Sequence, residues 1–200
     1  MAERVLLYGG TFDPPHNGHM ALLKAACEAV RPDVVLVTPT GTPPHKTGGE
    51  TPAALRLEMC RCFLPVWPGV QLDDTEIRRG GKSYTIDTVE TVRARYPGAA
   101  LYLCLGSDML LTFHEWRRYR DLLRLAALVV HSRQPGDGDA LHAAARQLEA
   151  EGGTVVFTGG PVLELSSTEL RALLEAGADV SALVPPAVRA VISRARLYQT

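Results

Sequence analysis

The chain has 200 residues, 46% of them hydrophobic and 22% charged, which is enough for an ordinary buried core in one domain spanning residues 1–200. Its formal net charge of −1 argues against a large polyanion such as tRNA as a partner, because such binding rests on dense lysine and arginine surfaces. The most apolar run, residues 125–130, is far shorter than the roughly 20 residues of a spanning helix, so we expect no membrane association.

The sequence also indicates the compartment. No basic-then-apolar leader precedes the first apolar run, so we expect no secretion. The four cysteines form no C-x-x-C pair and lie in apolar patterns: Cys27, Cys60, Cys62 and Cys104. We therefore expect reduced, buried thiols in a cytoplasmic protein.

Residues 5–8 predict a strand, and residues 9–19 (GGTFDPPHNGH) link it to a helix-periodic segment that ends near Val30. Glycines after a strand let backbone N–H groups approach a ligand closely. The helix directs its first N–H groups and positive dipole end at this turn, which favours an anion there. His16 and His19 would present two imidazoles to that anion from one face. A glycine turn with two unrelated histidines is the simpler interpretation, but the full H-x-G-H string is more specific.

A second strand is predicted at residues 33–38, which completes a right-handed βαβ unit. A loop rich in proline and glycine follows at residues 39–49, at the carboxyl end of that strand, where open α/β sheets carry ligand contacts. Lys46 in this loop either meets a phosphate or is an ordinary solvated lysine.

Residues 53–64 predict an amphipathic helix with Arg56 away from its apolar stripe. A short strand at residues 70–72, a polar turn at 79–82 and a helix at 83–96 follow, with Ser83 placed to cap that helix. Thr85 in its first turn could hold a carboxylate, although most such threonines only support the cap.

The strongest signal for a central strand lies at residues 100–105, with Gly106 and Asp108 at its carboxyl end. Asp108 could accept hydrogen bonds from ribose hydroxyls, cap the helix at residues 109–111, or do both. In the loop that follows, Trp116 could stack on a flat heterocycle or fill the core.

Two further strands are predicted at residues 126–131 and 154–157, and Arg133 follows the first of them. Near the end of the chain, Ser166 and Glu169 fit a capping box at a helix start. That helix N-terminus, with its three hydroxyls and Arg171, would form a second phosphate cradle, since a cap alone does not require the arginine.

Strands interleaved with helices predict a doubly wound, Rossmann-like α/β fold with a parallel sheet and C-terminal helices. All the candidate loops would meet at the carboxyl edge of that sheet. The crevice would be rich in cations and helix N-termini, with no clear nucleophile and no metal-ligand cluster. That composition favours direct phosphoryl or nucleotidyl transfer by positioning and charge neutralisation.

The motifs at residues 9–19, 42–46, 83–85, 106–108 with Trp116, and 165–171 together resemble bacterial nicotinate-nucleotide adenylyltransferases, of the nucleotidyltransferase superfamily. This resemblance covers nearly the whole chain. It implies that the 5′-phosphate of nicotinate mononucleotide attacks the α-phosphorus of ATP, giving the deamido dinucleotide and pyrophosphate in NAD biosynthesis. It also implies Mg²⁺ brought with ATP.

The resemblance further implies that His16 and His19 bind the ATP phosphates and stabilise the transition state. Other ATP contacts would come from Gly9, Gly10, Thr11, Phe12, Lys46, Gly106, Asp108, Ser166, Ser167 and Arg171. Nicotinate mononucleotide would meet Thr85, Trp116, Arg117 and Arg133. Arg117 stands where some relatives place an aromatic residue, so the contacts to the pyridine stay open.

Several alternatives stay open. Nicotinamide mononucleotide or pantetheine phosphate as the acceptor would keep the chemistry, although pantetheine-type relatives are shorter. Class I aminoacyl-tRNA synthetases share a related H-x-G-H signature, but this chain is short and has no K-x-S-K-S string. A non-catalytic nucleotide-binding protein, or a metal carrier using His16, His19 and His45, is an alternative of a different class. The sequence also leaves a homo-oligomer open.

Overall fold

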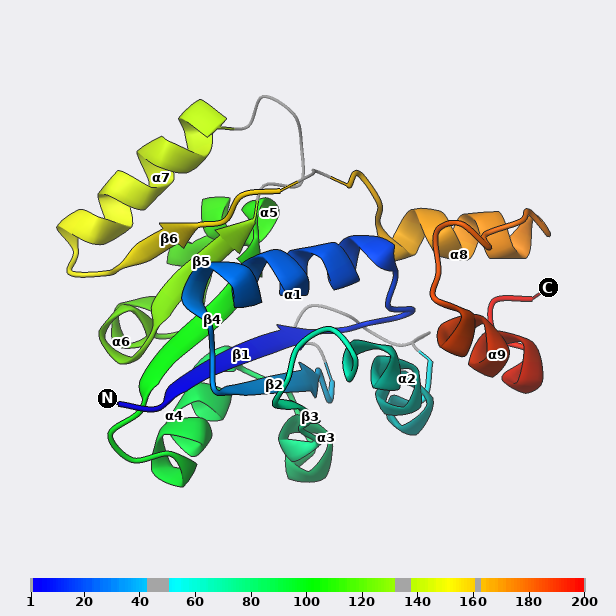
Figure 1. The fold of residues 1–200 in the computed structure, drawn as a ribbon, viewed down its shortest axis with the longest axis horizontal. Coiled ribbons are helices and arrows are strands. Elements are labelled where there is room, and N and C mark those ends of the chain that lie inside the picture. The colour runs from blue at the N-terminus through cyan, green and yellow to red at the C-terminus, as the bar shows by residue number, and fades with distance from the viewer. Residues whose placement is uncertain (1, 43–50, 132–137, 161–162, 200) are drawn as a thin grey trace.

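The structure is a computed structural model that describes residues 2–42, 51–131, 138–160 and 163–199. Its centre is a parallel sheet in the order β3-β2-β1-β4-β5-β6 (Figure 1). All six predicted strands are confirmed: β1 (Arg4–Gly10), β2 (Val34–Pro39), β3 (Val70–Leu72), β4 (Ala100–Gly106), β5 (Ala127–His131) and β6 (Val155–Phe157).

Helices cover both faces of this sheet, which gives the doubly wound Rossmann-like fold that the sequence predicts. The longer ones are α1 (Asn17–Val30), α2 (Ala53–Met59), α4 (Thr85–Arg95), α6 (Tyr119–Leu125), α7 (Gly138–Ala150), α8 (Ser167–Glu175) and α9 (Pro186–Ala195). Shorter turns of helix are η1 (Cys60–Phe63), α3 (Thr75–Arg79), α5 (Ser107–Leu111) and η2 (Phe113–Glu115). No helix in the described ranges combines the length and apolar character needed to cross a bilayer.

The four inner strands, β2, β1, β4 and β5, read as continuous apolar runs because side chains on both faces are buried. Along β1, Leu6 and Tyr8 pack into the cluster beneath α1 and α9, whereas Val5 and Leu7 pack into the cluster beneath α4 and α6. This alternation is the two-residue period of a strand.

The strand order reverses between β1 and β4. From β1 the chain moves outward to β2 and β3, and from β4 it moves the opposite way to β5 and β6. Loops that leave the carboxyl ends of β1 and β4 therefore diverge, and open sheets bind ligands in the crevice this creates.

Two segments differ from the prediction in detail, and two predicted caps are wrong. The short helix α3 precedes the predicted polar turn, and the helical segment predicted at residues 53–64 divides into α2 and the 3₁₀ turn η1. Ser83 does not cap α4, whose N-cap is Tyr84, because the Ser83 hydroxyl instead accepts the Gly41 N–H at 3.2 Å. Asp108 does not cap either, since α5 begins at Ser107, two residues earlier than predicted, with Gly106 as its N-cap.

Arg56 is a further correction, because it is only 1% exposed rather than directed to solvent. Its guanidinium donates hydrogen bonds to three backbone carbonyls inside the protein. The cysteines are buried and unbridged, as expected. Burial raises the pKa of the Cys27 and Cys62 thiols to about 12, so both stay protonated at neutral pH.

Candidate active site

The turn between β1 and α1 ends in a capping box made of two histidines. His16 is the N-cap of α1, and its Nδ1 accepts the His19 N–H at 3.3 Å. In return, Nδ1 of His19 accepts the His16 N–H at 3.3 Å. An acceptor Nδ1 leaves the proton of a neutral imidazole on Nε2, which makes Nε2 the donor of each ring. The box therefore fixes two imidazoles in one orientation, with their centroids 3.7 Å apart.

Two glycines make room for aromatic rings at this turn, Gly18 for His16 and Gly10 for Phe12. A Cβ on Gly18 would lie 3.0 Å from Nδ1 of His16, so the glycine in H-x-G-H lets the box close. A Cβ on Gly10 would lie 2.9 Å from the Phe12 ring. That ring is buried and packs edge-on to His19 with centroids 5.2 Å apart. Phe12 thus supports His19 with its side chain, which is itself buried.

The start of α8 packs directly against this turn, beside the start of α1 (Figure 1). The Ser167 hydroxyl donates to the Pro14 carbonyl at 2.9 Å, and Nη1 of Arg171 donates to the Asp13 carbonyl at 2.7 Å. Segments some 150 residues apart in the chain are joined in this way. Arg171 therefore lies at the same turn that carries His16.

A second capping box closes α8. The Ser166 hydroxyl accepts the Glu169 N–H at 3.2 Å, and the Glu169 carboxylate accepts the Ser166 N–H at 2.9 Å. The hydroxyl of Ser166 also donates to that carboxylate. These hydrogen bonds from Ser166, with a smaller contribution from the nearby His16, hold the pKa of Glu169 below its usual range. The prediction of a capping box at this position is confirmed.

A cavity of about 590 Å³ opens beside the β1 turn, in the crevice between β1 and β4. Gly9, Gly10 and Thr11 form one wall of it. The lining also includes the buried Glu76 and Ser83, Tyr84, Thr85, Met109, Thr112, Glu115, Trp116 and Arg117. Its size is within the usual range of small-molecule sites.

Trp116 and Arg117 lie next to each other on the cavity wall. The Trp116 ring packs on Phe113 with centroids 5.1 Å apart. The Arg117 guanidinium lies 4.5 Å from the centre of the Tyr84 ring, a cation–π contact that joins this segment to the start of α4. The charged Arg117 side chain thus packs on an aromatic ring of the cavity lining, Tyr84.

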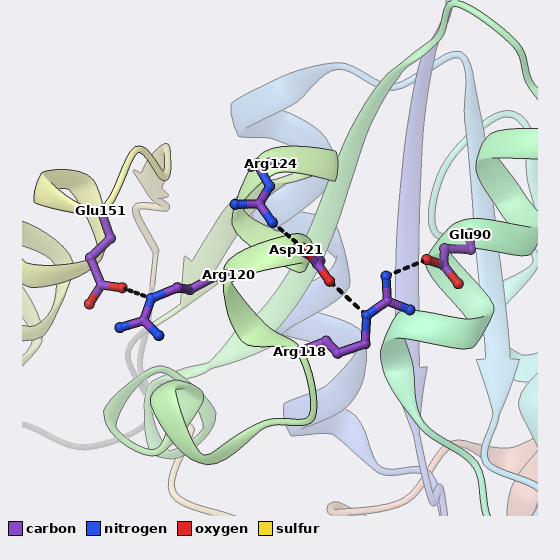
Figure 2. A network of polar contacts seen from close by, with 6 residues as sticks. All are labelled: Glu90, Arg118, Arg120, Asp121, Arg124 and Glu151. Atoms are coloured by element: carbon purple, nitrogen blue, oxygen red, sulfur yellow. Dashed lines mark hydrogen bonds and ion pairs between the residues drawn. The ribbon is translucent and has the colours of Figure 1, made fainter.

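A network of charged side chains holds the next residues in place (Figure 2). Arg118 bonds Glu90 on α4 at 2.9 Å and Asp121 on α6 at 2.6 Å, and Arg120 bonds Glu151 at 2.8 Å. Single exposed ion pairs contribute little to stability. Their effect here is to tie the segment that carries Trp116 and Arg117 to α4 and to the end of α7.

The other candidates fall into two groups. Gly106 and Asp108 lie at the end of β4, with Gly106 buried and Asp108 exposed, and neither is among the described residues that line the cavity. Lys46 and Arg133 lie outside the described residues. Sequence reasoning missed the buried side chains of Arg56 and Glu76 and the bond of Tyr198 to Asp13. It placed Arg56 away from the apolar stripe of its helix, so the pattern gave no signal for burial.

The groups near the turn suit phosphates. Two imidazole rings, two helix N-termini and the Arg171 guanidinium gather at this turn. Within the described ranges, no group of three or more His, Cys, Asp and Glu side chains is arranged to hold a metal ion.

Comparison with known proteins agrees with this geometry. Residues 7–173 match the model of the cytidylyltransferase-like family. Two proteins named "Probable nicotinate-nucleotide adenylyltransferase" are similar to this chain over 98% of its length. The one from Pelobacter propionicus is 40% identical over 98% of its own length, and the one from Neisseria meningitidis serogroup B is 37% identical over 99%.

Among solved structures, the fold is similar to Plasmodium falciparum nicotinic acid mononucleotide adenylyltransferase complexed with NaAD. The TM-score is 0.81 over 98% of this chain and 97% of that one, at 20% identity, which shows a common fold. The chain therefore belongs to the cytidylyltransferase-like family and, within it, to the nicotinate-nucleotide adenylyltransferases.

Proposed function

We propose that this protein transfers the adenylyl group of ATP to nicotinate mononucleotide, giving nicotinate adenine dinucleotide and pyrophosphate in NAD biosynthesis. One observation carries the proposal. The His16–His19 box and the start of α8 meet beside a cavity of nucleotide size at the reversal point of the sheet. Family membership supports the same activity.

The donor turn, residues 9–19, would bind the triphosphate together with the start of α8. Nε2–H groups of His16 and His19 would donate to phosphate oxygens and stabilise the charge that develops on them. Arg171 uses two of its five N–H groups on Asp13 and Thr168, which leaves three for phosphate. We further propose that Gly9, Gly10, Thr11 and the backbone of Phe12 frame the nucleotide, with Ser166, Ser167, Gly106, Asp108 and Lys46 as additional ATP contacts.

The acceptor cavity, defined by the lining residues given above, would bind nicotinate mononucleotide. The Tyr84 side chain makes no cap hydrogen bond to α4, so the N–H groups of its first turn, at Thr85 and Ile86, would be available to a carboxylate ligand. The Arg117 guanidinium beside Tyr84 adds positive charge there. Trp116 would stack on the pyridine, and Arg133 would meet the acceptor phosphate.

In the reaction, an oxygen of the acceptor 5′-phosphate forms a bond to the α-phosphorus of ATP. The bond from that phosphorus to the oxygen bridging to the β-phosphate breaks, and pyrophosphate leaves with the electron pair. The chain supplies position and fixed positive charge rather than a nucleophile of its own.

The groups we assign to the triphosphate are nitrogen donors, whereas Mg²⁺ takes oxygen ligands. These residues therefore fit a Mg²⁺ ion that is carried by the phosphate oxygens of ATP. When bound, the ion neutralises phosphate charge. Residues 1–200 would act as one nucleotidyltransferase domain, and the four free thiols favour the reducing cytoplasm.

The test is to incubate purified protein with ATP, Mg²⁺ and one acceptor at a time, and to measure pyrophosphate. We expect release with nicotinate mononucleotide and much less with nicotinamide mononucleotide or pantetheine phosphate. A clear preference for another acceptor would replace the substrate proposed here. Nucleotide binding without pyrophosphate release would instead indicate a non-catalytic binding protein.

A further inference from the structure

Arg56 is a buried cation that joins the turn between β1 and α1 to both described ends of the connection between β2 and α2. Its Nε donates to the Thr51 carbonyl at 3.0 Å, its Nη1 to the Thr11 carbonyl at 2.9 Å, and its Nη2 to the Gly41 carbonyl at 3.0 Å. Among the described residues, no carboxylate lies within ion-pair distance of it. A buried charge is costly unless it is well hydrogen-bonded, so these carbonyls are what make its position tolerable.

The bond to Thr11 fixes the backbone of the donor turn. In a trans peptide the C=O and the following N–H point in opposite directions, so a fixed Thr11 carbonyl also sets the direction of the Phe12 N–H. Phe12 has a φ of +50°, in the left-handed region that non-glycine residues rarely adopt. Its ring supports His19, so the peptide held by Arg56 lies at the base of the histidine box.

The bond to Gly41 reaches the acceptor cavity. The Gly41 N–H donates to the Ser83 hydroxyl at 3.2 Å, and the Ser83 N–H donates to the Thr42 carbonyl at 2.9 Å. Ser83 directly precedes Tyr84 and Thr85, which line the cavity. A Cβ on Gly41 would lie 2.5 Å from the Glu76 carbonyl, so this loop packs tightly against α3.

The α2 end of that connection is anchored to the donor turn a second time. The Asp13 carboxylate accepts the Thr51 N–H at 3.2 Å and the Tyr198 hydroxyl. The Tyr198 hydroxyl in turn accepts a hydrogen bond from the hydroxyl of Thr51 at 2.9 Å. Thr51 is thus fixed to the donor turn, and Arg56 links it to the Gly41 end of the same connection.

We propose that Arg56 is a positioning residue that holds the donor turn and the acceptor cavity at the separation and orientation that in-line attack requires. This inference rests on the function proposed above. Arg56 touches neither substrate in this account, because its three bonds are to backbone carbonyls. Its removal leaves each subsite nearly intact but loosens their relation to one another.

The first test is Arg56→Lys, which keeps the charge but has all its donors on one atom and does not match three separate carbonyls. We expect kcat to fall about 100-fold, the size of effect that a small misplacement of reacting groups produces. The dissociation constants of ATP and of nicotinate mononucleotide, each measured alone by calorimetry, should change only a few-fold. A merely structural role would not separate kcat from the two binding constants in this way.

Met59→Ala is the matched control, because Met59 is equally buried on the same helix and contributes only packing. It should lower the melting temperature without lowering kcat at temperatures where the protein is folded. In Arg56→Ala, millimolar guanidinium should restore about tenfold of the lost kcat by occupying the vacated space, whereas ammonium should not. Guanidinium should not raise the kcat of the wild type.

The inference is overturned if Arg56→Lys keeps kcat within about threefold of the wild type, or if Met59→Ala loses as much kcat as Arg56→Lys. Should neither Arg56 variant fold, Ser83→Ala tests the same link without a buried charge. It should lower kcat about tenfold, and an unchanged kcat would count against the link. A wild type that is inactive with ATP and nicotinate mononucleotide would instead refute the proposed function.

Discussion

Helices α1 and α8 both begin with a capping box, but the two boxes are built from different side chains. Ser166 and Glu169 form the usual version, with backbone bonds of 2.9 and 3.2 Å and an exposed carboxylate. His16 and His19 form the other, with both bonds at 3.3 Å and one ring fully buried. The histidine box is the longer and weaker cap. What it gains is two imidazoles locked in orientation with Nε2 as donor, so we infer that at α1 the cap serves the chemistry.

Among the variants that test this difference, His19→Ala has the largest expected effect. We expect kcat to fall about a thousandfold or more, because the phosphates lose a fixed donor in the transition state. Folding should survive, since the variant loses one weak cap bond. Pyrophosphate release gives the rate, and a thermal melt followed by circular dichroism gives the stability.

His142→Ala is the control for that experiment, because His142 is an exposed histidine on α7 that contacts Phe157. It should leave kcat unchanged. Turnover of His19→Ala within a few-fold of the wild type would mean that the histidine box is only a cap.

The next test concerns what α8 adds to the turn. Arg171→Ala removes the bond to the Asp13 carbonyl together with a cation beside the proposed triphosphate. We expect kcat/KM for ATP to fall about 100-fold, as for the loss of one charged donor. The control is Arg194→Ala, which breaks an exposed pair with Glu58 instead of a bond to the turn and should change kcat/KM little. Equal losses in the two variants would argue against a phosphate role for Arg171.

The sheet could be predicted from the sequence because its strands are buried on both faces and therefore read as unbroken apolar runs. The histidine pair was also accessible, since a spacing of three residues at a helix start places both rings on one face. Because the strands are parallel, the loops that follow them, including the one with the histidine pair, meet at the carboxyl edge of the sheet.

What escaped prediction are side chains whose partners lie on distant loops. The helical pattern places Arg56 off the apolar stripe, where a surface residue is expected. Its three carbonyl partners lie outside its own helix, and a helical pattern does not give their position. Ser83 stands at the position expected of an N-cap, yet its hydroxyl accepts a hydrogen bond from a backbone N–H of the loop after β2. Helix α3 has five residues, too few for a periodic signal.

A smaller effect is expected for Ser166→Ala. The variant loses the hydroxyl that accepts the Glu169 N–H, so the free energy of unfolding should fall by about 1 kcal/mol, the usual cost of an N-cap. Urea unfolding measures this directly. If Ser166 acts mainly as a cap, kcat/KM for ATP should fall less than tenfold. A loss as large as that of Arg171→Ala would show that Ser166 contacts the nucleotide itself.

The smallest and most selective difference between the boxes is their response to acid. Hydrogen bonds from Ser166 hold the pKa of Glu169 below its usual range, so the ionised carboxylate is favoured in the folded protein. A depressed folded pKa contributes stability that is complete above the unfolded value of about 4.3 and is lost as the pH falls through the folded value.

Glu169→Gln keeps a side chain that can accept the Ser166 N–H but does not titrate. The melting temperature of the wild type should therefore drop more steeply below about pH 4.3 than that of the variant. Other carboxylates with lowered pKa values, such as Asp73 and Asp121, are common to both proteins and cancel in the difference. Identical dependence of the two melting temperatures on pH would show that ionisation of Glu169 adds nothing to the α8 cap. The two boxes would then differ only in the imidazole rings that the α1 box carries.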